Sequence, residues 1–327
     1  MTEPLRCGVI GVGAMGRIHA QNLAYRLPLT TLAGVADADP GVAKSVAEAL
    51  GVPSFASASD LIAYADAIVI ATPRRFHAPL IEEAAAAGKH VFSEKPLAST
   101  LDECDAAISA VQQAGVKLQI GFHRRFDANF RAVHEAISSG EVGAPLIVHT
   151  VSRDPYPAAG NASRSADDLI LETSIHDLDM ARFLTGSEIA EVFAVPVGES
   201  GSGIEGMVLT LRMANGAAVT IDNHLHSAYG YDQRVEVFGS GGMVTIANET
   251  AHRARTSTRQ AVTQALPLHF FAERYSDAYA DELGAFAKCI ADGTEPLVTG
   301  ADGRAAVAAA VAALESLATG APVRTGA

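Results

Sequence analysis

Short β-branched runs alternate with Ala-rich stretches through the first 122 residues of the chain. The run Ala67–Thr72 contains five successive apolar residues, as expected for a strand buried on both faces of a sheet. This alternation is typical of a parallel sheet covered by helices on both sides, so a doubly wound (Rossmann) domain is predicted over residues 1–122. The expected strands are Cys7–Ile10, Leu32–Ala36, Ala67–Thr72, His90–Ser93 and Lys117–Phe122, and the expected helices are Met15–Arg26, Val42–Leu50, His77–Gly88 and Leu101–Gly115.

The rhythm changes after Phe122, where strand patterns come to follow one another without helices between them. Such a succession indicates an antiparallel sheet, and Asn215-Gly216 is a strong hairpin signal. Residues 123–327 are predicted to form an α+β domain with a large, mostly antiparallel open sheet, whose C-terminal helices pack back near the cleft. The expected strands are Leu146–Ser152, Ala190–Val197, Gly206–Met213, Ala217–His226, Arg234–Phe238 and Met243–Ala247, and the expected helices are Asn129–Ser139, Leu169–Leu184, Asp277–Asp292 and Ala301–Ala318.

Composition excludes several broad classes of protein. Of 327 residues, 49% are hydrophobic and 19% are charged, which is enough apolar material for a sizeable core and excludes a disordered chain. The excess of 37 acidic over 24 basic residues gives a formal net charge of −13, which argues against nucleic acid or an anionic membrane as a partner. No apolar run approaches the ~18 residues of a membrane helix, and no targeting segment is recognised, so a soluble cytoplasmic protein is expected.

Cysteine and histidine spacing gives no metal signature. Cys7, Cys104 and Cys289 lie far apart and form no CxxC pair, which argues against a disulfide framework or a cysteine zinc site and fits the reducing cytoplasm. His224-Leu225-His226 is a strand alternation without an HExxH motif or an acidic loop. Metal-independent chemistry is therefore predicted.

The segment after the first expected strand reads Gly11-Val12-Gly13-Ala14-Met15-Gly16 and leads into a helix. In this GxGxxG pattern, Gly11 permits the tight turn, Gly13 lets backbone amides approach a pyrophosphate, and Gly16 lets the helix pack against the strand. The helix N-terminus supplies N–H groups and partial positive charge to the anion. We therefore predict that the segment, including Ala14 and Met15, binds a dinucleotide.

Asp37 ends the second expected strand, 21 residues after Gly16, where dinucleotide-binding domains carry an acid. Its carboxylate accepts hydrogen bonds from ribose hydroxyls and repels a 2′-phosphate, which favours NAD over NADP. The alternative is that Asp37 only begins the next helix, as part of Asp37-Ala38-Asp39-Pro40.

Further candidate residues follow two strands, at the sheet edge where doubly wound domains bind ligands. Thr72 and Pro73 follow one strand, and His77 either contacts the cofactor or begins a helix. The other strand leads into Ser93-Glu94-Lys95-Pro96, where Glu94 and Lys95 are candidate cofactor contacts. The proline could take the cis form and direct the lysine ammonium group into the crevice. A surface lysine in a loop is the alternative.

The Glu-Lys-Pro tripeptide after an N-terminal GxGxxG unit resembles the signature of the glucose–fructose oxidoreductase/inositol dehydrogenase (Gfo/Idh/MocA) family. The resemblance spans nearly the whole chain, and within the family the sequence is most similar to the bacterial myo-inositol 2-dehydrogenases. The segments that carry it are Gly121-Phe122-His123-Arg124-Arg125-Phe126-Asp127, Ser152-Arg153-Asp154-Pro155, Ile175-His176-Asp177-Leu178-Asp179-Met180-Ala181-Arg182-Phe183-Leu184 and Tyr229-Gly230-Tyr231-Asp232-Gln233-Arg234-Val235-Glu236-Val237-Phe238-Gly239.

The resemblance implies NAD-dependent oxidation of a secondary alcohol on a cyclic polyol or sugar, with an inositol as the first candidate substrate. His176 is then the base that takes the hydroxyl proton, because imidazole titrates near neutral pH. Glu172, four residues earlier, would lie on the same helical face and orient the ring. Lys95 would hold the reacting oxygen and offset its developing charge. Without the family, a buried helix histidine with no ligand is at least an equal interpretation of His176.

The sequence departs from this family pattern in the candidate site. Glu172 stands at a position where the inositol dehydrogenases that this chain resembles have aspartate. Those proteins also tend to have a Gly-Gly pair shortly before it, where this chain has Asp167-Asp168-Leu169. His123 replaces an asparagine. One extra methylene moves a carboxylate by about 1 Å, enough to alter how a substrate is positioned. These changes are compatible with the same class of reaction, but the identity of the polyol does not follow from the sequence.

Several polar residues are candidates for contacts to substrate hydroxyls, each with a turn or strand-face alternative. Arg125 binds substrate or braces the hinge between domains, and Tyr231 lies in the family-like Tyr-Gly-Tyr-Asp stretch. The remaining candidates are Asp154, Asn161, Asp168 and His224.

Two other functions stay open. One is a dehydrogenase of a pyranose sugar or modified inositol, and the other is a catalytically silent nicotinamide-binding regulator. The intact Lys95 and His176 favour an enzyme. The resemblance also implies a homo-oligomer, a tetramer formed through the exposed sheet face.

Overall fold

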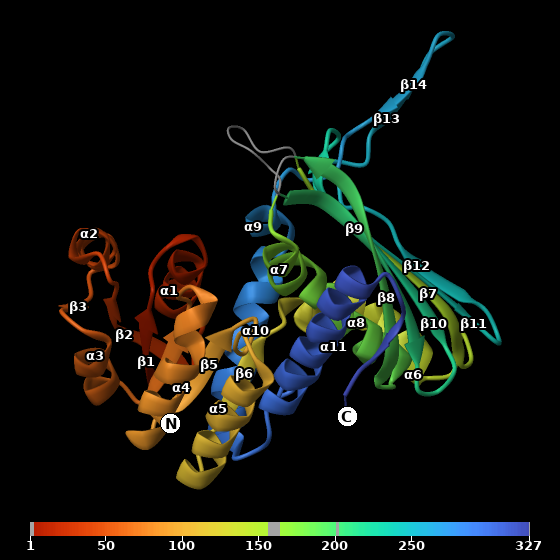
Figure 1. The fold of residues 1–327 in the computed structure, drawn as a ribbon. Helices are drawn as coiled ribbons and strands as arrows, with labels where there is room; N and C mark the ends of the chain where they lie inside the picture. The colour runs from red at the N-terminus through yellow and green to blue at the C-terminus, as the bar shows by residue number, and fades with distance from the viewer. Residues whose placement is uncertain (1–2, 156–163, 201–202, 327) are drawn as a thin grey trace. The chain divides into compact units, whose positions relative to one another are not determined.

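The computed structural model describes residues 3–155, 164–200 and 203–326, drawn as a ribbon in Figure 1. The chain divides into two compact units. The first combines Met1–Asp127 with Asp277–Val307, and the second combines Ala128–Ser276 with Ala308–Ala327.

A parallel six-stranded sheet in the order β3-β2-β1-β4-β5-β6 forms the centre of the first unit. This is the strand order of dinucleotide-binding domains, and it confirms the predicted Rossmann architecture. The two central strands, β1 and β4, are apolar and almost fully buried from Cys7 and Ala67 onward. The strands are β1 Leu5–Ile10, β2 Thr30–Ala36, β3 Ser54–Phe55, β4 Ala67–Ile70, β5 His90–Glu94 and β6 Leu118–Gly121.

Helices connect these strands, and their ends follow local chemistry. Asp39 caps α2 by accepting hydrogen bonds from the amides of Gly41 and Val42. Thr100 and Glu103 form a reciprocal capping box at the start of α5. The helical segments are α1 Ala14–Tyr25, α2 Pro40–Leu50, α3 Ala58–Tyr64, η1 Arg74–Phe76, α4 His77–Ala86, α5 Leu101–Ala114, η2 His123–Phe126 and α10 Ser276–Asp292.

The second unit contains a seven-stranded sheet in the order β12-β11-β7-β10-β9-β8-β15. It is mostly antiparallel, as predicted, with one parallel pair between β7 and β10. The predicted hairpin joins β9 to β10, and Gly216 takes a left-handed φ of 92° there. The strands are β7 Pro145–Pro155, β8 Ile189–Ser200, β9 Gly203–Met213, β10 Ala218–Ser227, β11 Asp232–Gly239, β12 Met243–Ile246 and β15 Val323–Arg324, with a separate pair, β13 Arg255–Ser257 and β14 Val262–Gln264.

The single helix predicted over Leu169–Leu184 is wrong in its local form. Its place is taken by a short helix, a π-helical turn over Ile170–Ser174 and a second helix. A π turn inserts an extra residue, so the α-helical i, i+4 relation assumed for Glu172 and His176 does not apply. The helical segments of this unit are α6 Ala128–Ser138, α7 Ala166–Leu169, η3 Ile170–Ser174, α8 Ile175–Thr185 and α9 Phe271–Arg274, and α11 Gly300–Thr319 runs from one unit into the other.

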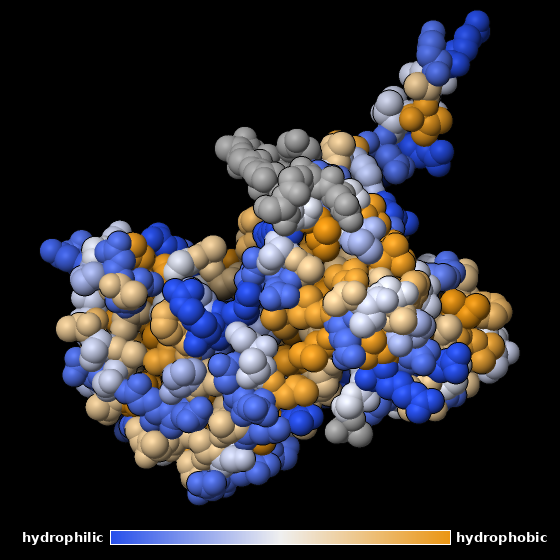
Figure 2. All heavy atoms as spheres, in the orientation of Figure 1, coloured by the Kyte–Doolittle hydropathy of each residue, from blue (hydrophilic) through white to orange (hydrophobic). Residues whose placement is uncertain are grey.

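Apolar side chains remain exposed on the strands of the second sheet, and Figure 2 shows hydrophobic and hydrophilic residues intermingled on the viewed face. The exposed large apolar residues on these strands are Leu146, Ile147, Val195, Val197, Phe238 and Met243. Among the described residues, none of the helices has the length and apolarity that crossing a membrane takes.

Candidate functional site

The turn after β1 requires glycine at its first and last positions. Gly11 takes a left-handed φ of 82°, and a Cβ there would lie 2.7 Å from the carbonyl oxygen of Ala71. A Cβ on Gly16 would lie 1.8 Å from the carbonyl oxygen of Gly11. Both glycines therefore let the turn, β4 and α1 approach one another closely.

The middle of the same turn is open. A Cβ on Gly13 would meet no atom within 4 Å, and Gly13 and Ala14 are exposed. Gly13 is the N-cap of α1, and no side chain caps the helix. The amides of the first helical turn, including that of Met15, are thus available to an anion from outside. An exposed backbone cradle at a helix N-terminus fits the pyrophosphate of NAD.

Asp37 follows β2 and lies beside the glycine turn. Its Oδ2 accepts a hydrogen bond of 2.7 Å from the amide of Val12, and its Oδ1 accepts one of 2.9 Å from the amide of Asp39. The residue that caps α2 is Asp39, so beginning that helix is not the role of Asp37. Each carboxylate oxygen keeps a further acceptor site, which fits the hydroxyls of a ribose.

His77 is the first residue of α4, and its ring is buried between two loops. Nδ1 lies 2.7 Å from the carbonyl oxygen of Pro96, and Nε2 lies 2.8 Å from that of Thr72. Burial lowers the pKa of the ring, against the raising effect of these two hydrogen bonds. His77 therefore ties the loop after β4, which contains Thr72 and Pro73, to the loop after β5.

Lys95 follows the last residue of β5 and is half-buried. The Lys95–Pro96 peptide bond is cis, as the sequence suggested. The amide of Lys95 donates a hydrogen bond of 3.3 Å to Oε2 of Glu94. The Glu94 side chain is turned into the protein, where Oε1 lies 2.7 Å from Nε2 of His19. The sequence placed Glu94 at the cofactor, and the structure shows that its carboxylate holds the lysine segment from inside.

Arg125 lies in η2 and is buried. Its Nη2 donates a hydrogen bond of 3.0 Å to Oδ1 of Asp302, near the start of α11. The other carboxylate oxygen of Asp302 accepts hydrogen bonds from the amide and hydroxyl of Thr299. This ion pair joins two segments of the first unit that are distant in the sequence.

The remaining predicted catalytic residues lie in the second unit. Glu172 stands in the π turn η3, and its side chain is 46% exposed and 4.0 Å from Nη1 of Arg164. His176 lies at the start of α8 and is half-buried. Asp177, next to it, is fully buried and accepts hydrogen bonds of 2.9 Å from Ser152 and 3.0 Å from Asn223. Sequence reasoning missed this anchor, which holds the start of α8 on β7 and β10.

The polar candidates of the second unit have ordinary local surroundings. Asp154 is half-buried on β7, and Nδ1 of His224 accepts a hydrogen bond from the amide of His226. The amide of Asp168 donates a hydrogen bond of 3.1 Å to Oγ of Ser165, which caps α7. The ring of Tyr231 packs edge-on against Tyr275 at 6.0 Å. Asn161 lies outside the described residues.

Asp232 is a heavily hydrogen-bonded carboxylate of the same unit and was not singled out from the sequence. Its fully buried side chain accepts hydrogen bonds from Arg234, Tyr229 and Asn248. Burial raises its pKa, but these hydrogen bonds outweigh burial and hold the pKa below its usual value. The network braces the start of β11, close to Tyr231.

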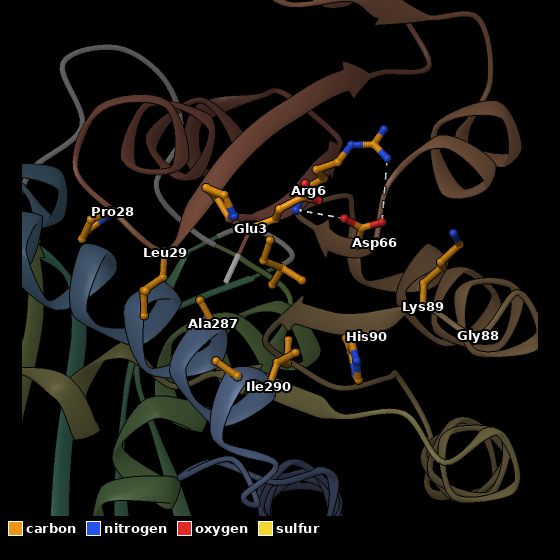
Figure 3. Close-up of a pocket in the computed structure, with 13 residues that line it drawn as sticks. Glu3, Arg6, Pro28, Leu29, Asp66, Gly88, Lys89, His90, Ala287 and Ile290 are labelled. Carbon is orange, nitrogen blue, oxygen red and sulfur yellow. Dashed lines mark hydrogen bonds and ion pairs between the residues drawn. The ribbon is translucent and has the colours of Figure 1, made fainter. Parts of the chain in front are cut away.

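A pocket in the first unit is lined by residues at the amino ends of β1, β4 and β5 (Figure 3). Arg6 and Asp66 lie on its wall, where the amide of Arg6 donates a hydrogen bond of 3.2 Å to Asp66. The glycine turn follows the carboxyl end of β1, so this pocket lies at the opposite edge of the sheet. It is therefore separate from the proposed nucleotide cradle.

Comparison with known proteins agrees with this architecture. The oxidoreductase family with an NAD-binding Rossmann fold (GFO_IDH_MocA) matches residues 5–122, and the GFO/IDH/MocA C-terminal domain matches residues 130–245. The chain is 40% identical to "Uncharacterized oxidoreductase YrbE" of Bacillus subtilis, over 99% of this chain and 97% of that protein. It is 37% identical to the myo-inositol 2-dehydrogenase of Thermotoga maritima, over 96% of each.

A solved structure shows the same fold with ligands bound. The scyllo-inositol dehydrogenase from Lactobacillus casei, with bound NAD(H) and scyllo-inositol, has a TM-score of 0.91 to this chain. The two are 27% identical, and the match covers 99% of this chain and 100% of the other. With two family domains matched in order and the nucleotide cradle in place, the chain is a member of the GFO/IDH/MocA oxidoreductase family, with an NAD-binding Rossmann domain.

Proposed function

We propose that this protein is an NAD-dependent dehydrogenase that oxidises a secondary alcohol of a cyclic polyol, with an inositol as the first candidate. The observation that carries the proposal is the combination of an open dinucleotide cradle with Lys95 at the carboxyl end of β5 of the same sheet. The full-length similarity to inositol dehydrogenases supports the choice of substrate.

The residues of the first unit bind and orient the cofactor, which accepts the hydride when bound. The amides from Gly13 to Met15 hold the pyrophosphate, and Asp37 accepts hydrogen bonds from the ribose hydroxyls. A 2′-phosphate would meet the Asp37 carboxylate, so NAD is preferred to NADP. Thr72 and Pro73 follow β4 at the same sheet edge.

The remaining roles concern the reacting hydroxyl. Lys95 donates a hydrogen bond to the substrate oxygen and offsets the negative charge that develops there. His176 takes the hydroxyl proton as the carbon–hydrogen bond breaks and the hydride leaves. Glu172 orients the imidazole and stabilises its charged form. Arg125, Asp154 and Tyr231 are proposed to contact the other substrate hydroxyls, with no metal ion required.

We also propose that the protein is cytoplasmic and works as a homotetramer. All three cysteines are free and buried, as suits a reducing compartment. The exposed apolar side chains on the second sheet support assembly through that sheet. Native mass spectrometry measures the number of subunits directly.

A pyranose or modified inositol is the second candidate substrate. It is favoured by Glu172, whose longer side chain stands in a π turn, and by Asp168 one turn earlier. Both residues depart from the pattern typical of inositol dehydrogenases, which have aspartate in place of Glu172 and a Gly-Gly pair shortly before it.

The test is NADH formation at mildly alkaline pH across a panel of inositol isomers and pyranoses, with NADP in parallel. Turnover of myo-inositol with NAD supports the first candidate, and turnover of only another polyol makes Glu172 and Asp168 specificity determinants. No turnover across the panel, with NAD still bound, would replace the enzyme by a nicotinamide-binding regulator.

A further inference from the structure

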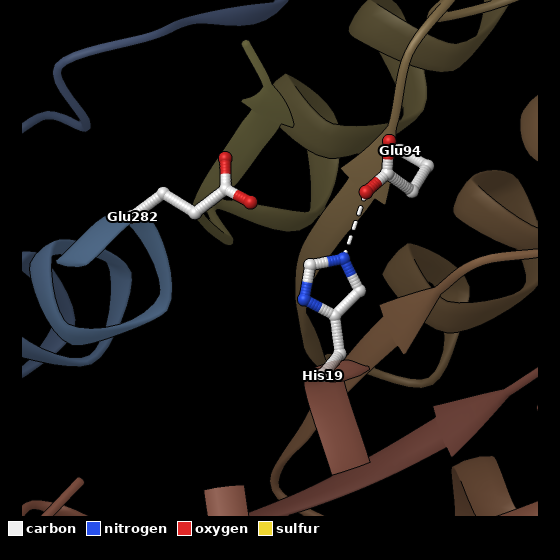
Figure 4. Close-up of side chains that lie close together, drawn as sticks. All are labelled: His19, Glu94 and Glu282. Carbon is white, nitrogen blue, oxygen red and sulfur yellow. Dashed lines mark hydrogen bonds and ion pairs between the residues drawn. The ribbon is translucent and has the colours of Figure 1, made fainter. Parts of the chain in front are cut away.

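Three ionisable side chains from separate elements converge inside the first unit (Figure 4). His19 comes from α1, Glu94 ends β5, and Glu282 comes from α10. Their exposed fractions are 0%, 8% and 0%. One ring nitrogen and one oxygen of each carboxyl group all lie within 4.8 Å of one another. His19 and Glu282 have no role in the reaction proposed above.

Aromatic rings surround this cluster and keep its dielectric constant low. The His19 ring packs edge-on against Phe92 at 5.3 Å and against Tyr279 at 6.2 Å, and Phe92 contacts Phe286 at 6.0 Å. The helix α10 is also tied to the sheet, because Gln119 donates a hydrogen bond of 2.7 Å to the main-chain carbonyl of Glu282. Two negative charges repel each other strongly in such surroundings, so ionising both carboxyl groups at once is energetically unfavourable.

The two carboxyl groups have opposite surroundings. Glu94 is bonded to His19 and to the amide of Lys95. Burial raises the pKa of Glu94, but the hydrogen bond from His19 and the nearby positive charge of Lys95 outweigh burial and hold this pKa below its usual value. Neither carboxyl oxygen of Glu282 has a hydrogen-bond partner. Burial and the negative charge of Glu94 both raise the pKa of Glu282 well above its usual value. Such a separation divides a carboxyl pair into one anion and one neutral acid.

We propose that Glu282 is held as a neutral carboxylic acid and is a positioning residue for Lys95, acting through His19 and Glu94. His19 donates from Nε2 to Glu94, which leaves Nδ1 as a buried acceptor with no hydrogen-bond partner. A neutral Glu282 has an O–H donor, which Nδ1 of His19 lacks. The Glu282 carboxyl lies within 4.8 Å of the His19 ring, so a side-chain rotation or one bridging water would join the two groups.

The consequence for the reaction is that the cluster fixes the position of the Lys95 main chain. The acid orients the imidazole, the imidazole holds Oε1 of Glu94, and Oε2 of Glu94 accepts the amide of Lys95. The position of the Lys95 main chain is therefore set by groups behind it, on α1 and α10. This role rests on the function proposed above for Lys95.

A divalent cation is the competing occupant of the cluster. It would need both carboxylates ionised, with every donor atom drawn to about 2.0–2.6 Å from the ion. Nε2 of His19 is already engaged by Glu94 at 2.7 Å, and the charge of Lys95 acts on the same carboxylate. A proton satisfies the cluster without these rearrangements.

Kinetics of two substitutions at one position test the positioning role. Glu282→Gln keeps a neutral donor and is expected to hold kcat within about twofold, whereas Glu282→Leu is expected to lower kcat about 10-fold or more with little change in the KM for NAD, since misplacing a reacting group by ~1 Å can cost ~10²-fold. Asp281→Asn is the matched control, an exposed carboxyl next to Glu282 on α10. A Gln variant as slow as the Leu variant, or a Leu variant as fast as wild type, would overturn the proposal.

Thermal unfolding against pH tests the protonation state independently of activity. If the pKa of Glu282 is higher in the folded than in the unfolded protein, its protonated form stabilises the fold. This stabilisation is complete below the pKa of the unfolded chain, about 4.3, and is lost as the pH rises through the pKa of the folded protein. Glu282→Gln cannot ionise, so its Tm relative to wild type is expected to increase from pH 4 to pH 8. Asp281→Asn should show no such trend.

Two results, one from these melts and one from metal analysis of the purified protein, would overturn the proposal. One is a Tm difference for Glu282→Gln that does not change with pH. The other is a stoichiometric divalent ion in the purified protein that is lost in Glu282→Gln, which would assign the cluster to a cation. If no polyol is oxidised but the Tm trend is observed, the function fails while the neutral acid stands.

Discussion

Glu94 and Lys95 are adjacent in the chain but have contrasting surroundings. Glu94 is buried and bonded to His19 on α1, whereas Lys95 is half-buried and begins the loop after β5. His77 holds the next residue of that loop through the carbonyl of Pro96. A cationic side chain on a loop held at both of these points is suited to stabilise charge at a defined position, because little reorganisation is needed during the reaction.

Lys95→Ala is expected to lower kcat by at least about 10²-fold, the loss typical when one donor to a developing oxyanion is removed. NAD binding should stay close to normal, because the glycine turn and Asp37 are untouched. Steady-state kinetics and NAD titration measure the two effects. Lys89→Ala is the control, since Lys89 bonds the carbonyl of Ala65 at the far edge of the sheet. Unchanged turnover in Lys95→Ala would remove this lysine from the reaction.

Asp37→Ser is expected to raise the ratio of NADP to NAD efficiency by about 10-fold or more, because removing one carboxylate repulsion of ~1.4 kcal/mol changes a binding ratio about tenfold. The measurement is kcat/KM with each cofactor. Asp39→Ser is the matched control, since serine can still cap α2 and the cofactor carboxylate is kept. A shift of equal size in both variants would assign cofactor selectivity to another residue.

The π turn η3 is the element that most changes the expected geometry of the site. It places Glu172 on a half-exposed surface beside Arg164, just before α8, whose first turn contains His176 and the buried anchor Asp177. Such turns are frequent at functional sites. An apolar period does not reveal this turn, because its five residues are fewer than the window over which a helical period can be recognised.

Glu172→Gln is expected to lower kcat by roughly 10-fold or more, part of the ~10²–10⁴-fold that positioned acid–base groups contribute. The measurement is the pH profile of kcat, because a neutral amide no longer stabilises the imidazolium of His176. Arg164→Gln removes the ion partner but keeps the carboxylate, and an exposed pair of this kind is worth ~0–1 kcal/mol. Full activity in Glu172→Gln would make Glu172 a bystander.

The regular elements of the first unit could be predicted because their signals are local. The strand at Ala67 and the helix at Leu101 end within two residues of the expected positions. The strand β3 and the helix α3 were missed, since Ser54–Phe55 is too short to show a period and Ala58–Tyr64 has only seven residues. Asp37 and Lys95 were found through spacing, whereas His19, Asp177 and Glu282 carry no sequence signal that separates them from other buried polar residues.

At the scale of the whole molecule, the chain crosses between its two units more often than a single boundary after residue 122 allows. Residues Asp277–Val307 belong to the first unit. Within it, Leu283, Phe286 and Cys289 of α10 join the same buried cluster as Cys7 and Val9 of β1. This contact spans nearly the whole chain, so no window of the sequence could reveal it. It brings a late helix into the core of the Rossmann domain and carries Glu282 to Glu94.

The three thiols provide a test of this packing, because all of them are buried in the first unit. Burial raises the pKa of Cys7 and Cys104 to about 12 and that of Cys289 to about 11. A raised folded pKa gives stability that is complete below the unfolded value of about 8.5 and is lost as the pH rises toward the folded value. Each thiol should therefore lower the free energy of unfolding by about 1.4 kcal/mol per pH unit in that window.

Thermal melts of wild type and of the triple variant Cys7→Ala, Cys104→Ala, Cys289→Ala, from pH 7 to pH 10.5, measure this slope. The variant starts from a lower Tm, because truncation leaves cavities, but its Tm should fall less steeply above pH 8.5. Below pH 8 the two curves should run parallel, which serves as the internal control. In wild type, a thiol reagent at pH 8 should leave the native protein unmodified and label all three cysteines after unfolding. Rapid labelling of Cys289 in the native protein would show that α10 opens from the Rossmann core without global unfolding.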